Sequence, residues 1–186
     1  MEIRIKEPFN KEKMKSLKAG DSVLLTGTIY TARDAAHKKL VEMVGRGENL
    51  PFALEDSIIY YVGPTPAKDG YPIGSAGPTT SYRMDAYAPK LLELGQAAMI
   101  GKGQRNEAVK EAVVKNGAVY FAAIGGAAAL IAGCIKEAEV IAFEELGAEA
   151  VRKLYVEDMP LVVVNDALGG DLYEEGKEKY LNSLKK

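Results

Sequence analysis

The sequence predicts a layered α/β domain. Apolar stretches of strand length alternate with amphipathic stretches of helix length along most of the chain, with no obvious linker or repeat. With 186 residues, 47% of them hydrophobic, the chain can bury a substantial core. We therefore expect a single domain spanning residues 1–186.

The first predicted unit is a strand followed by a helix. Residues 22–31 are rich in apolar and β-branched side chains, which favour a strand. Ala36, Leu40 and Val44 then recur at helical spacing, so we expect a helix from about residue 32 to residue 44. Residues 58–62 predict another short strand.

A loop rich in glycine and proline, residues 63–78, follows that strand. Compact domains seldom carry about sixteen residues of irregular chain without a use for them. The loop could shape a site or dock a partner, or it could be a plain surface excursion. After it we expect a helix over residues 81–94, a strand over 97–100 and a helix over 105–115.

Residues 118–135 are uncharged and approach the length of a membrane-spanning helix. Their alanine-rich composition and the central Gly125-Gly126 pair instead favour a buried strand over residues 119–124, a turn, and a helix of small residues ending near Gly133. The remaining elements are strands over residues 135–142, 153–157 and 161–164 and a polar helix over residues 174–184.

Composition excludes several classes of function. The net charge of −2 and the pI near 5.6 give no basic footprint for nucleic acid. The first residues lack the apolar segment of a secretory signal, so we expect a cytoplasmic protein without a membrane anchor. The one cysteine, Cys134, cannot form an internal disulfide, and no paired His or Cys spacing predicts a metal site.

The segment Gly77-Pro-Thr-Thr-Ser-Tyr-Arg83-Met-Asp85 is the most informative motif. Gly77 and Pro78 end one segment, and Thr79, Thr80 or Ser81 could cap the helix expected to follow. Arg83 offers a planar fork suited to a carboxylate. The motif could therefore hold an anion at a helix N-terminus, or it could be a capped surface helix only.

Two other clusters lie where strands are expected to end. Thr31-Ala-Arg33-Asp34-Ala-Ala-His37 joins a strand to a helix, and Arg33 and His37 lie on one helical face. A lone histidine is more often a structural hydrogen-bonding residue than a base, and Asp34 could simply complement the helix dipole. Gly101-Lys102-Gly103 lacks the spacing of a nucleotide-binding loop, which leaves Lys102 as either a carboxylate contact or an exposed turn lysine.

These three motifs, with Ile124-Gly-Gly-Ala-Ala-Ala129, resemble the β subunit of the two-subunit, class I iron-sulfur fumarate hydratases and L-tartrate dehydratases. The resemblance runs from about Gly20 to Leu168. It implies a swivelling β/β/α domain with a mixed sheet, equivalent to the C-terminal domain of the single-chain enzymes. It also implies a separate α subunit whose cysteines hold a [4Fe-4S] cluster, so that this chain alone binds no cofactor and no metal.

The resemblance also assigns roles to residues. Five residues would bind a small dicarboxylate: Arg33, Thr79, Thr80, Arg83 and Lys102. Thr79 and Lys102 would also be catalytic, with Thr79 facing the reacting carbons and taking part in proton transfer. His37 and Asp34 would have supporting roles, with His37 orienting either Arg33 or the start of the helix.

The function that the resemblance implies is reversible hydration of fumarate to malate, within the tricarboxylic acid cycle, by this chain and its α subunit together. L-tartrate dehydration is the alternative reaction. Gln104, where many members of the resembled family carry asparagine or another small polar group, leaves the substrate open. A non-catalytic dicarboxylate-binding or assembly subunit is the alternative from another class. In isolation the chain could also form a homodimer.

Overall fold

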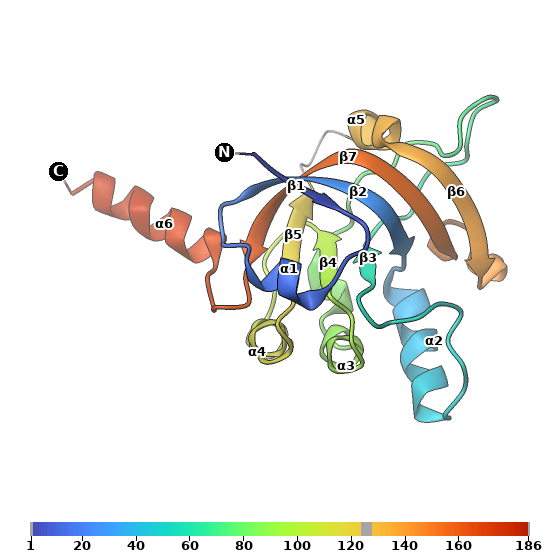
Figure 1. Ribbon diagram of the computed structural model, residues 1–186, viewed down its shortest axis with the longest axis horizontal. Helices are drawn as coiled ribbons and strands as arrows, with labels where there is room; N and C mark the ends of the chain where they lie inside the picture. Colours follow the sequence, from blue (N-terminus) through green and yellow to red (C-terminus); the bar gives the residue numbers. More distant parts are fainter. Residues whose placement is uncertain (1, 124–127, 186) are drawn as a thin grey trace.

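The computed structural model describes residues 2–123 and 128–185. These residues form a layered α/β fold around one seven-stranded sheet with the strand order β1-β2-β3-β4-β5-β7-β6 (Figure 1). The strands are β1 Glu2–Lys6, β2 Ser22–Thr31, β3 Ile58–Tyr60, β4 Ala98–Gly101, β5 Val119–Ala123, β6 Ile135–Ala142 and β7 Val151–Asn165. The helices are α1 Lys11–Lys15, α2 Asp34–Gly45, α3 Ala88–Glu93, α4 Glu107–Asn116, α5 Ala128–Cys134 and α6 Leu172–Ser183, with short 3-10 helices η1 Ser81–Met84 and η2 Glu144–Glu149.

The sheet is mixed and closes on itself. Strands β1 to β5 pair in parallel with their neighbours, whereas β7 runs antiparallel to β2, β5 and β6. Because β7 pairs with both β2 and β5, strands β2, β3, β4, β5 and β7 form a ring. Figure 1 shows β2 and β7 curving together over β3, β4 and β5.

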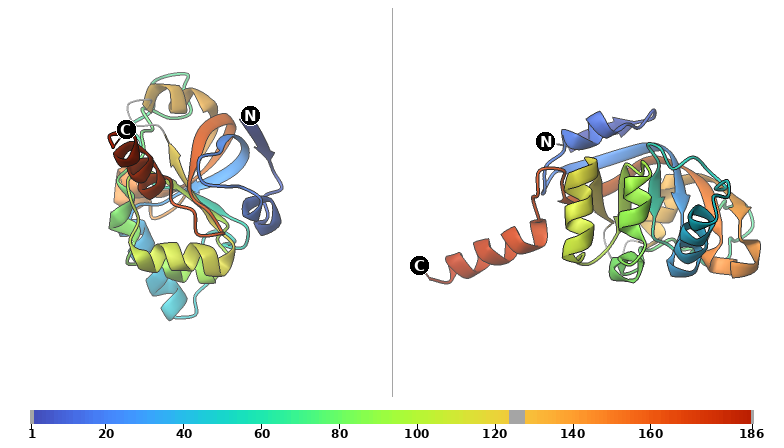
Figure 2. Two further views of the ribbon diagram at one scale, coloured as in Figure 1. Left: turned by 90° about the vertical axis from the view of Figure 1, so that its left-hand side faces the viewer. Right: turned by 90° about the horizontal axis from the view of Figure 1, so that it is seen from below.

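Two hydrophobic cores follow from this arrangement. Inside the ring, side chains such as Ile58, Tyr60 and Ile100 pack with Phe121 and Leu154. Alternate residues of β3, β4 and β5 point the other way, where α2, α3 and α4 lie along one side of the molecule (Figure 2). Both faces of β3, β4 and β5 are therefore buried, which explains why these strands read as continuous apolar runs.

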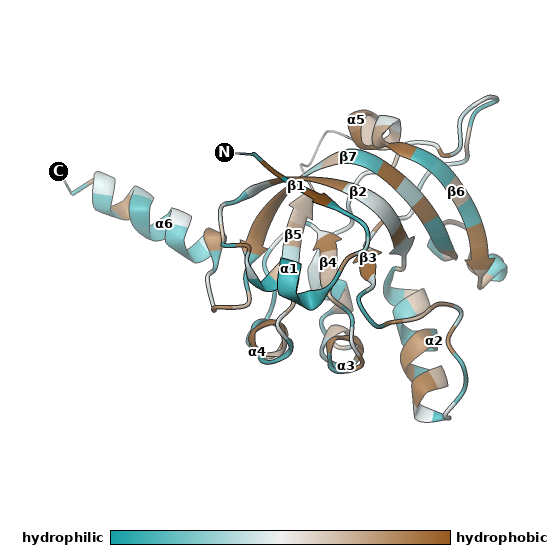
Figure 3. Ribbon diagram, in the orientation of Figure 1, coloured by the Kyte–Doolittle hydropathy of each residue, from teal (hydrophilic) through white to brown (hydrophobic). Residues whose placement is uncertain are grey.

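Helices α2, α3 and α4 bury apolar side chains in this outer core and keep their polar sides in solvent (Figure 3). On α2 the buried residues are Ala36, His37 and Leu40. No described helix combines the length and the apolar character that crossing a bilayer requires.

Most of the predicted elements are confirmed, including the layered α/β class. Strand β2 has the predicted bounds, and α2, β3, β4 and α4 lie within a few residues of theirs. The stretch of residues 118–135 contains strand β5 and helix α5 in place of a membrane helix. The predicted end of the strand at Ile124 and the turn at Gly125-Gly126 lie outside the described residues.

One predicted helix, over residues 81–94, is wrong as a continuous element. The chain forms η1, turns at Asp85 to Tyr87, and begins α3 with Pro89 in its first turn. In the middle of a helix Pro89 would lack an N–H donor and would clash with the carbonyl of Asp85, so the helix restarts where proline is tolerated.

Strand β7 corrects a second expectation, because the two strands predicted over residues 153–157 and 161–164 are one strand. Asp158 between them has a positive φ of 47°, and its N–H donates to Thr26 Oγ1 of β2 over 2.9 Å. Pairing with β2 shifts register there and continues on both sides. Strand β1, helix α1 and the 3-10 helix η2 had no counterpart among the predicted elements.

Candidate functional site

The predicted site residues come together where parallel strands end. Arg33 follows β2, the stretch containing Thr79 lies against the end of β3, and Lys102 follows β4. The carboxyl ends of parallel strands share one edge of the sheet, which is where open α/β folds bind ligands.

Thr79, Thr80 and Ser81 form a short extended stretch between the ends of β3 and β4. Thr79 N–H donates to the carbonyl oxygen of Tyr61 over 2.7 Å, and Thr80 forms a parallel bridge with Lys102. Ser81 N–H donates to the Lys102 carbonyl oxygen over 2.9 Å, and Lys102 N–H donates to Ser81 Oγ over 3.1 Å. The structure thus places Thr79 and Thr80, both half-buried, beside the exposed Lys102.

Glycine at position 101 makes this close approach possible. A Cβ on Gly101 would collide with Ser81 Oγ and lie 3.0 Å from the ring of Tyr61. The hydroxyl of Tyr120 reinforces the same junction, at 2.9 Å from Ser81 Oγ and 2.8 Å from the Gly103 carbonyl oxygen. The glycines around Lys102 therefore bring two loops together.

The predicted helix cap is wrong in detail. Thr80 stands at the N-cap of η1 without a side-chain cap hydrogen bond, and Ser81 Oγ accepts the Lys102 N–H instead. Because η1 is a 3-10 turn of four residues, it supplies no helix N-terminus for an anion.

The two predicted arginines differ in their surroundings. Arg83, on η1, is exposed, and its guanidinium forms no ion pair or hydrogen bond with any described residue. Arg33 is held by carboxylates: its Nη2 lies 3.2 Å from Glu149 Oε1 and 3.6 Å from Asp34 Oδ1. Arg33 also packs against Gly63, where a Cβ would lie 2.8 Å from its Nη1.

His37 is fully buried under the start of α2. Its Nδ1 donates to the Arg33 carbonyl oxygen over 2.9 Å, and its ring lies edge-on to the ring of Tyr61 with the centroids 5.1 Å apart. Burial lowers the pKa of His37 from 6.5 to about 4, so the imidazole is neutral at pH 7. The contact with Arg33 is present, and its supporting role stays a prediction.

Sequence reasoning missed Asp85 and Arg105, which form a buried ion pair beside this edge. Arg105 Nε donates to Asp85 Oδ1 over 2.7 Å, and the two side chains are 1% and 7% exposed. Glu149, the partner of Arg33, was also missed. Glu149 lies on the short 3-10 helix η2, which has no periodic sequence pattern. It pairs with Arg33, which is more than a hundred residues away in the sequence.

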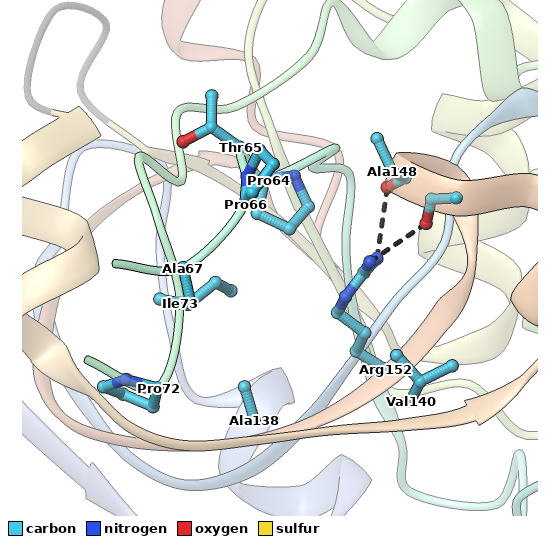
Figure 4. A pocket seen from close by; sticks show the side chains of 11 residues that line it. Pro64, Thr65, Pro66, Ala67, Pro72, Ile73, Ala138, Val140, Ala148 and Arg152 are labelled. Carbon is cyan, nitrogen blue, oxygen red and sulfur yellow. Dashed lines mark hydrogen bonds between the residues drawn. The ribbon is translucent and has the colours of Figure 1, made fainter. Parts of the chain in front are cut away.

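A separate cavity of about 400 Å³ lies between the glycine- and proline-rich loop and β6 (Figure 4). Its lining is mostly apolar, from Pro64, Pro66, Pro72 and Ile73, and it includes none of the predicted site residues. Arg152 points into it, with its guanidinium held by the carbonyl oxygens of Gly147 and Ala148 over 2.9 and 3.2 Å.

A family model described as "Fumarase C-terminus" matches residues 1–176. The chain belongs to the fumarase C-terminus family. The matched residues include the segments Thr31–His37, Gly77–Asp85 and Gly101–Gly103 that supply the candidate site.

Individual relatives agree with this assignment. The chain is 41% identical over 179 residues to "Fumarate hydratase 2" of Leishmania major, covering 94% of this chain and 32% of that protein. It is 44% identical over 153 residues to "Fumarate hydratase class I, aerobic" of Escherichia coli, covering 81% of this chain and 28% of that protein. This family member therefore spans about a third or less of these fumarate hydratases.

A third relative has nearly the same length as this chain. The "Putative L(+)-tartrate dehydratase subunit beta" of Methanocaldococcus jannaschii is 42% identical over 182 residues, covering 95% of this chain and 93% of that protein. The same kind of domain therefore occurs both as part of longer proteins and as a chain of its own.

Proposed function

We propose that this chain is the β subunit of a hydro-lyase that hydrates fumarate reversibly to malate together with a cluster-bearing α subunit. One observation carries the proposal. The Thr79-Thr80 turn is bonded to the Lys102 loop at the carboxyl edge of the sheet, in a member of the fumarase C-terminus family. Matching relatives named fumarate hydratase support the reaction class.

The cationic side chains would bind the substrate. Lys102 and Arg83 are exposed, so their charges are available to the carboxylates of a small dianion. Arg33 would exchange its present carboxylate partners, Asp34 and Glu149, for a substrate carboxylate. Thr80, beside Lys102, would contribute a hydroxyl hydrogen bond to the same anion.

Thr79 is the residue we propose for proton transfer. Its backbone is fixed by the hydrogen bond to Tyr61, and the half-buried residue directly precedes Thr80, which forms a bridge with Lys102. A threonine hydroxyl is a weak base unless a neighbour activates it. That neighbour would come from the partner subunit, which makes the complete site a shared one.

A [4Fe-4S] cluster does not fit this chain alone. Cys134 is the one cysteine in the sequence, and among the described residues no three His, Cys, Asp or Glu side chains are grouped as metal ligands. Such clusters are held by several cysteine thiolates. In this proposal the cluster belongs to the α subunit, and this chain binds and orients the substrate.

L-tartrate dehydration is the second candidate reaction. The Methanocaldococcus jannaschii relative, which has nearly the same length, carries that name. Tartrate and malate share two carboxylates and differ in their hydroxyl groups, so the same three cations would suit both. In this proposal Gln104, exposed two residues after Lys102, would help to discriminate between them.

Substituting the exposed cations tests the assignment in the assembled enzyme. Arg83→Ala and Lys102→Ala should each lower kcat/KM for fumarate by about 10- to 100-fold, because each removes a charged hydrogen bond to a carboxylate. Arg46→Ala is the matched control, since Arg46 is exposed and pairs with Glu48 on the surface. Near-normal kinetics in both site variants would exclude these two residues from substrate binding.

A further inference from the structure

The ion pair between Asp85 and Arg105 joins the two segments that carry the exposed cations of the site. Asp85 lies two residues after Arg83, and Arg105 lies three residues after Lys102. Asp85 Oδ1 accepts from Arg105 Nε over 2.7 Å, and Asp85 Oδ2 accepts the backbone N–H of Asn106 over 2.8 Å. Both carboxylate oxygens thus tie the Arg83 turn to the chain that follows Lys102.

Aromatic rings fix the guanidinium of Arg105 in place. Its central carbon lies 4.9 Å from the ring centroid of Tyr120 and 5.4 Å from that of Tyr61. Its Nη1 lies 3.2 Å from Met99 Sδ. These three side chains come from the outer faces of β5, β4 and the end of β3, so Arg105 is anchored to the sheet itself.

The same contacts continue to the third cation. Tyr61 packs edge-on against His37, with the ring centroids 5.1 Å apart at an interplanar angle of 78°. His37 Nδ1 in turn donates to the Arg33 carbonyl oxygen over 2.9 Å. An unbroken series of buried contacts therefore runs from Asp85 through Arg105, Tyr61 and His37 to the backbone of Arg33.

We propose that Asp85, Arg105, Tyr61 and His37, named here the Arg105 network, are positioning residues that fix Arg33, Arg83 and Lys102 relative to one another. Buried ion pairs are poor sources of net stability, because desolvation offsets their attraction. Their defined geometry instead holds the surrounding segments in one arrangement. A binding site needs such support, because its residues must stay in fixed positions relative to the ligand. This inference rests on the proposed function.

A double substitution separates positioning from stability. Asp85→Leu/Arg105→Met replaces the buried pair by apolar side chains, a change that folded proteins often tolerate without loss of stability. Arg46→Met/Glu48→Leu is the matched control, because it removes an exposed pair whose Nε to Oε1 distance is 2.6 Å. Both variants are compared with the unmodified chain.

Amide hydrogen exchange in the full chain gives the first readout. The amides of Ser81 and Lys102 bond across the two segments, so their exchange reports whether the segments stay together. The site variant should exchange about tenfold faster at both amides while its melting temperature stays near that of the control. Unchanged exchange in a folded site variant would overturn the proposal.

Kinetics of the assembled enzyme give the second readout. The site variant should lose about 100-fold in kcat/KM for the dicarboxylate, mainly through a higher KM, since the misplaced residues bind substrate. If the double variant does not fold, Arg105→Lys carries the same test, because it keeps a cation beside Asp85 but loses the planar contact with the tyrosines. Wild-type KM in the folded variant would contradict a positioning role.

The two readouts also separate this inference from the proposed function. An assembled wild-type enzyme that is inactive on fumarate, malate and tartrate would refute the hydro-lyase assignment. Faster exchange at Ser81 and Lys102 in the site variant would still show that the Arg105 network holds these segments together.

Discussion

Neighbouring tyrosines show how the environment of one residue decides what its polar atom contributes. Tyr60 points into the ring of strands, where its hydroxyl donates to the Ala76 carbonyl oxygen. Tyr61 points to the outer core, where its hydroxyl is buried and finds no partner among the described residues. The two side chains are alike in chemistry and burial and differ in hydrogen bonding.

Substituting each tyrosine by phenylalanine should therefore give different results. Tyr60→Phe should lower the free energy of unfolding by about 1 to 2 kcal/mol, because the Ala76 carbonyl loses its donor in a buried place. Tyr61→Phe should leave the free energy of unfolding within about 0.5 kcal/mol of the wild-type value or raise it, because the substitution removes a buried hydroxyl that has no hydrogen-bond partner. Urea denaturation of both variants measures the difference, and equal losses would contradict this reading.

His37 predicts how stability depends on pH. Its pKa is lowered to about 4 chiefly by burial, and the nearby charge of Arg105 lowers it as well, whereas Asp34 and the Arg33 carbonyl raise it. In the unfolded chain the pKa returns to about 6.5, so between these values the unfolded state binds the extra proton. The stability from neutral His37 is therefore present above pH 6.5 and is lost as pH falls toward 4.

The size of this effect can be measured against a variant that does not titrate. The gap between 6.5 and about 4 corresponds to about 3 kcal/mol of unfolding free energy. His37→Asn can keep a donor toward the Arg33 carbonyl, and its stability should fall less steeply than that of wild type between pH 6.5 and 4. If the unfolding free energies of the two proteins fell equally with pH, His37 would not be the source of the pH dependence.

Among the elements, the junction between β4 and the Thr79 stretch depends on glycine. Gly101→Ala should cost about 1 to 3 kcal/mol of stability, because the new methyl group would collide with Ser81 Oγ and crowd Tyr61. Gly45→Ala, at the end of α2, is the control, since nothing lies within 4 Å of a Cβ there. Thermal unfolding of both variants checks this, and a Gly101 variant as stable as the Gly45 variant would contradict the close packing.

The elements also show where sequence patterns succeed. Strands β3, β4 and β5 were predictable because each is a local run of mainly apolar residues, and β2 because it is rich in apolar and β-branched side chains. The helix predicted over residues 81–94 failed because Pro89 outweighed the apolar spacing of Leu91 and Leu92. Strand β1 alternates charged and apolar residues over five positions. This pattern is too short to predict a strand by itself, and the strand is stabilised by pairing with β2.

The candidate site was predictable to a similar degree. Arg33 and Lys102 directly follow β2 and β4, so their position at one edge follows from parallel pairing, whereas Thr79 reaches that edge through the loop after β3 and a hydrogen bond to Tyr61. The bond between Asp85 and Arg105, the carboxylate of Glu149 and the use of Ser81 Oγ by Lys102 depend on contacts between distant segments. No local pattern encodes such contacts.

At the scale of the whole molecule, the candidate site lies at the carboxyl ends of the parallel strands. Arg83 and Lys102 are exposed there, and in the proposed function the iron-sulfur cluster belongs to another protein, because the sequence contains one cysteine. In the longer fumarate hydratases about two thirds or more of the sequence lies outside the matched part, since the match covers 32% and 28% of their lengths. A site completed by a second subunit is the account that joins these observations.

Hydratase activity under anaerobic conditions tests this account most directly, with fumarate absorbance followed for the chain alone and for the chain co-produced with a candidate α subunit carrying three cluster cysteines. We predict no turnover by the chain alone and reversible hydration by the pair. Absence of activity on fumarate, malate and tartrate in a pair that contains the cluster would contradict the account and favour a dicarboxylate-binding or assembly subunit.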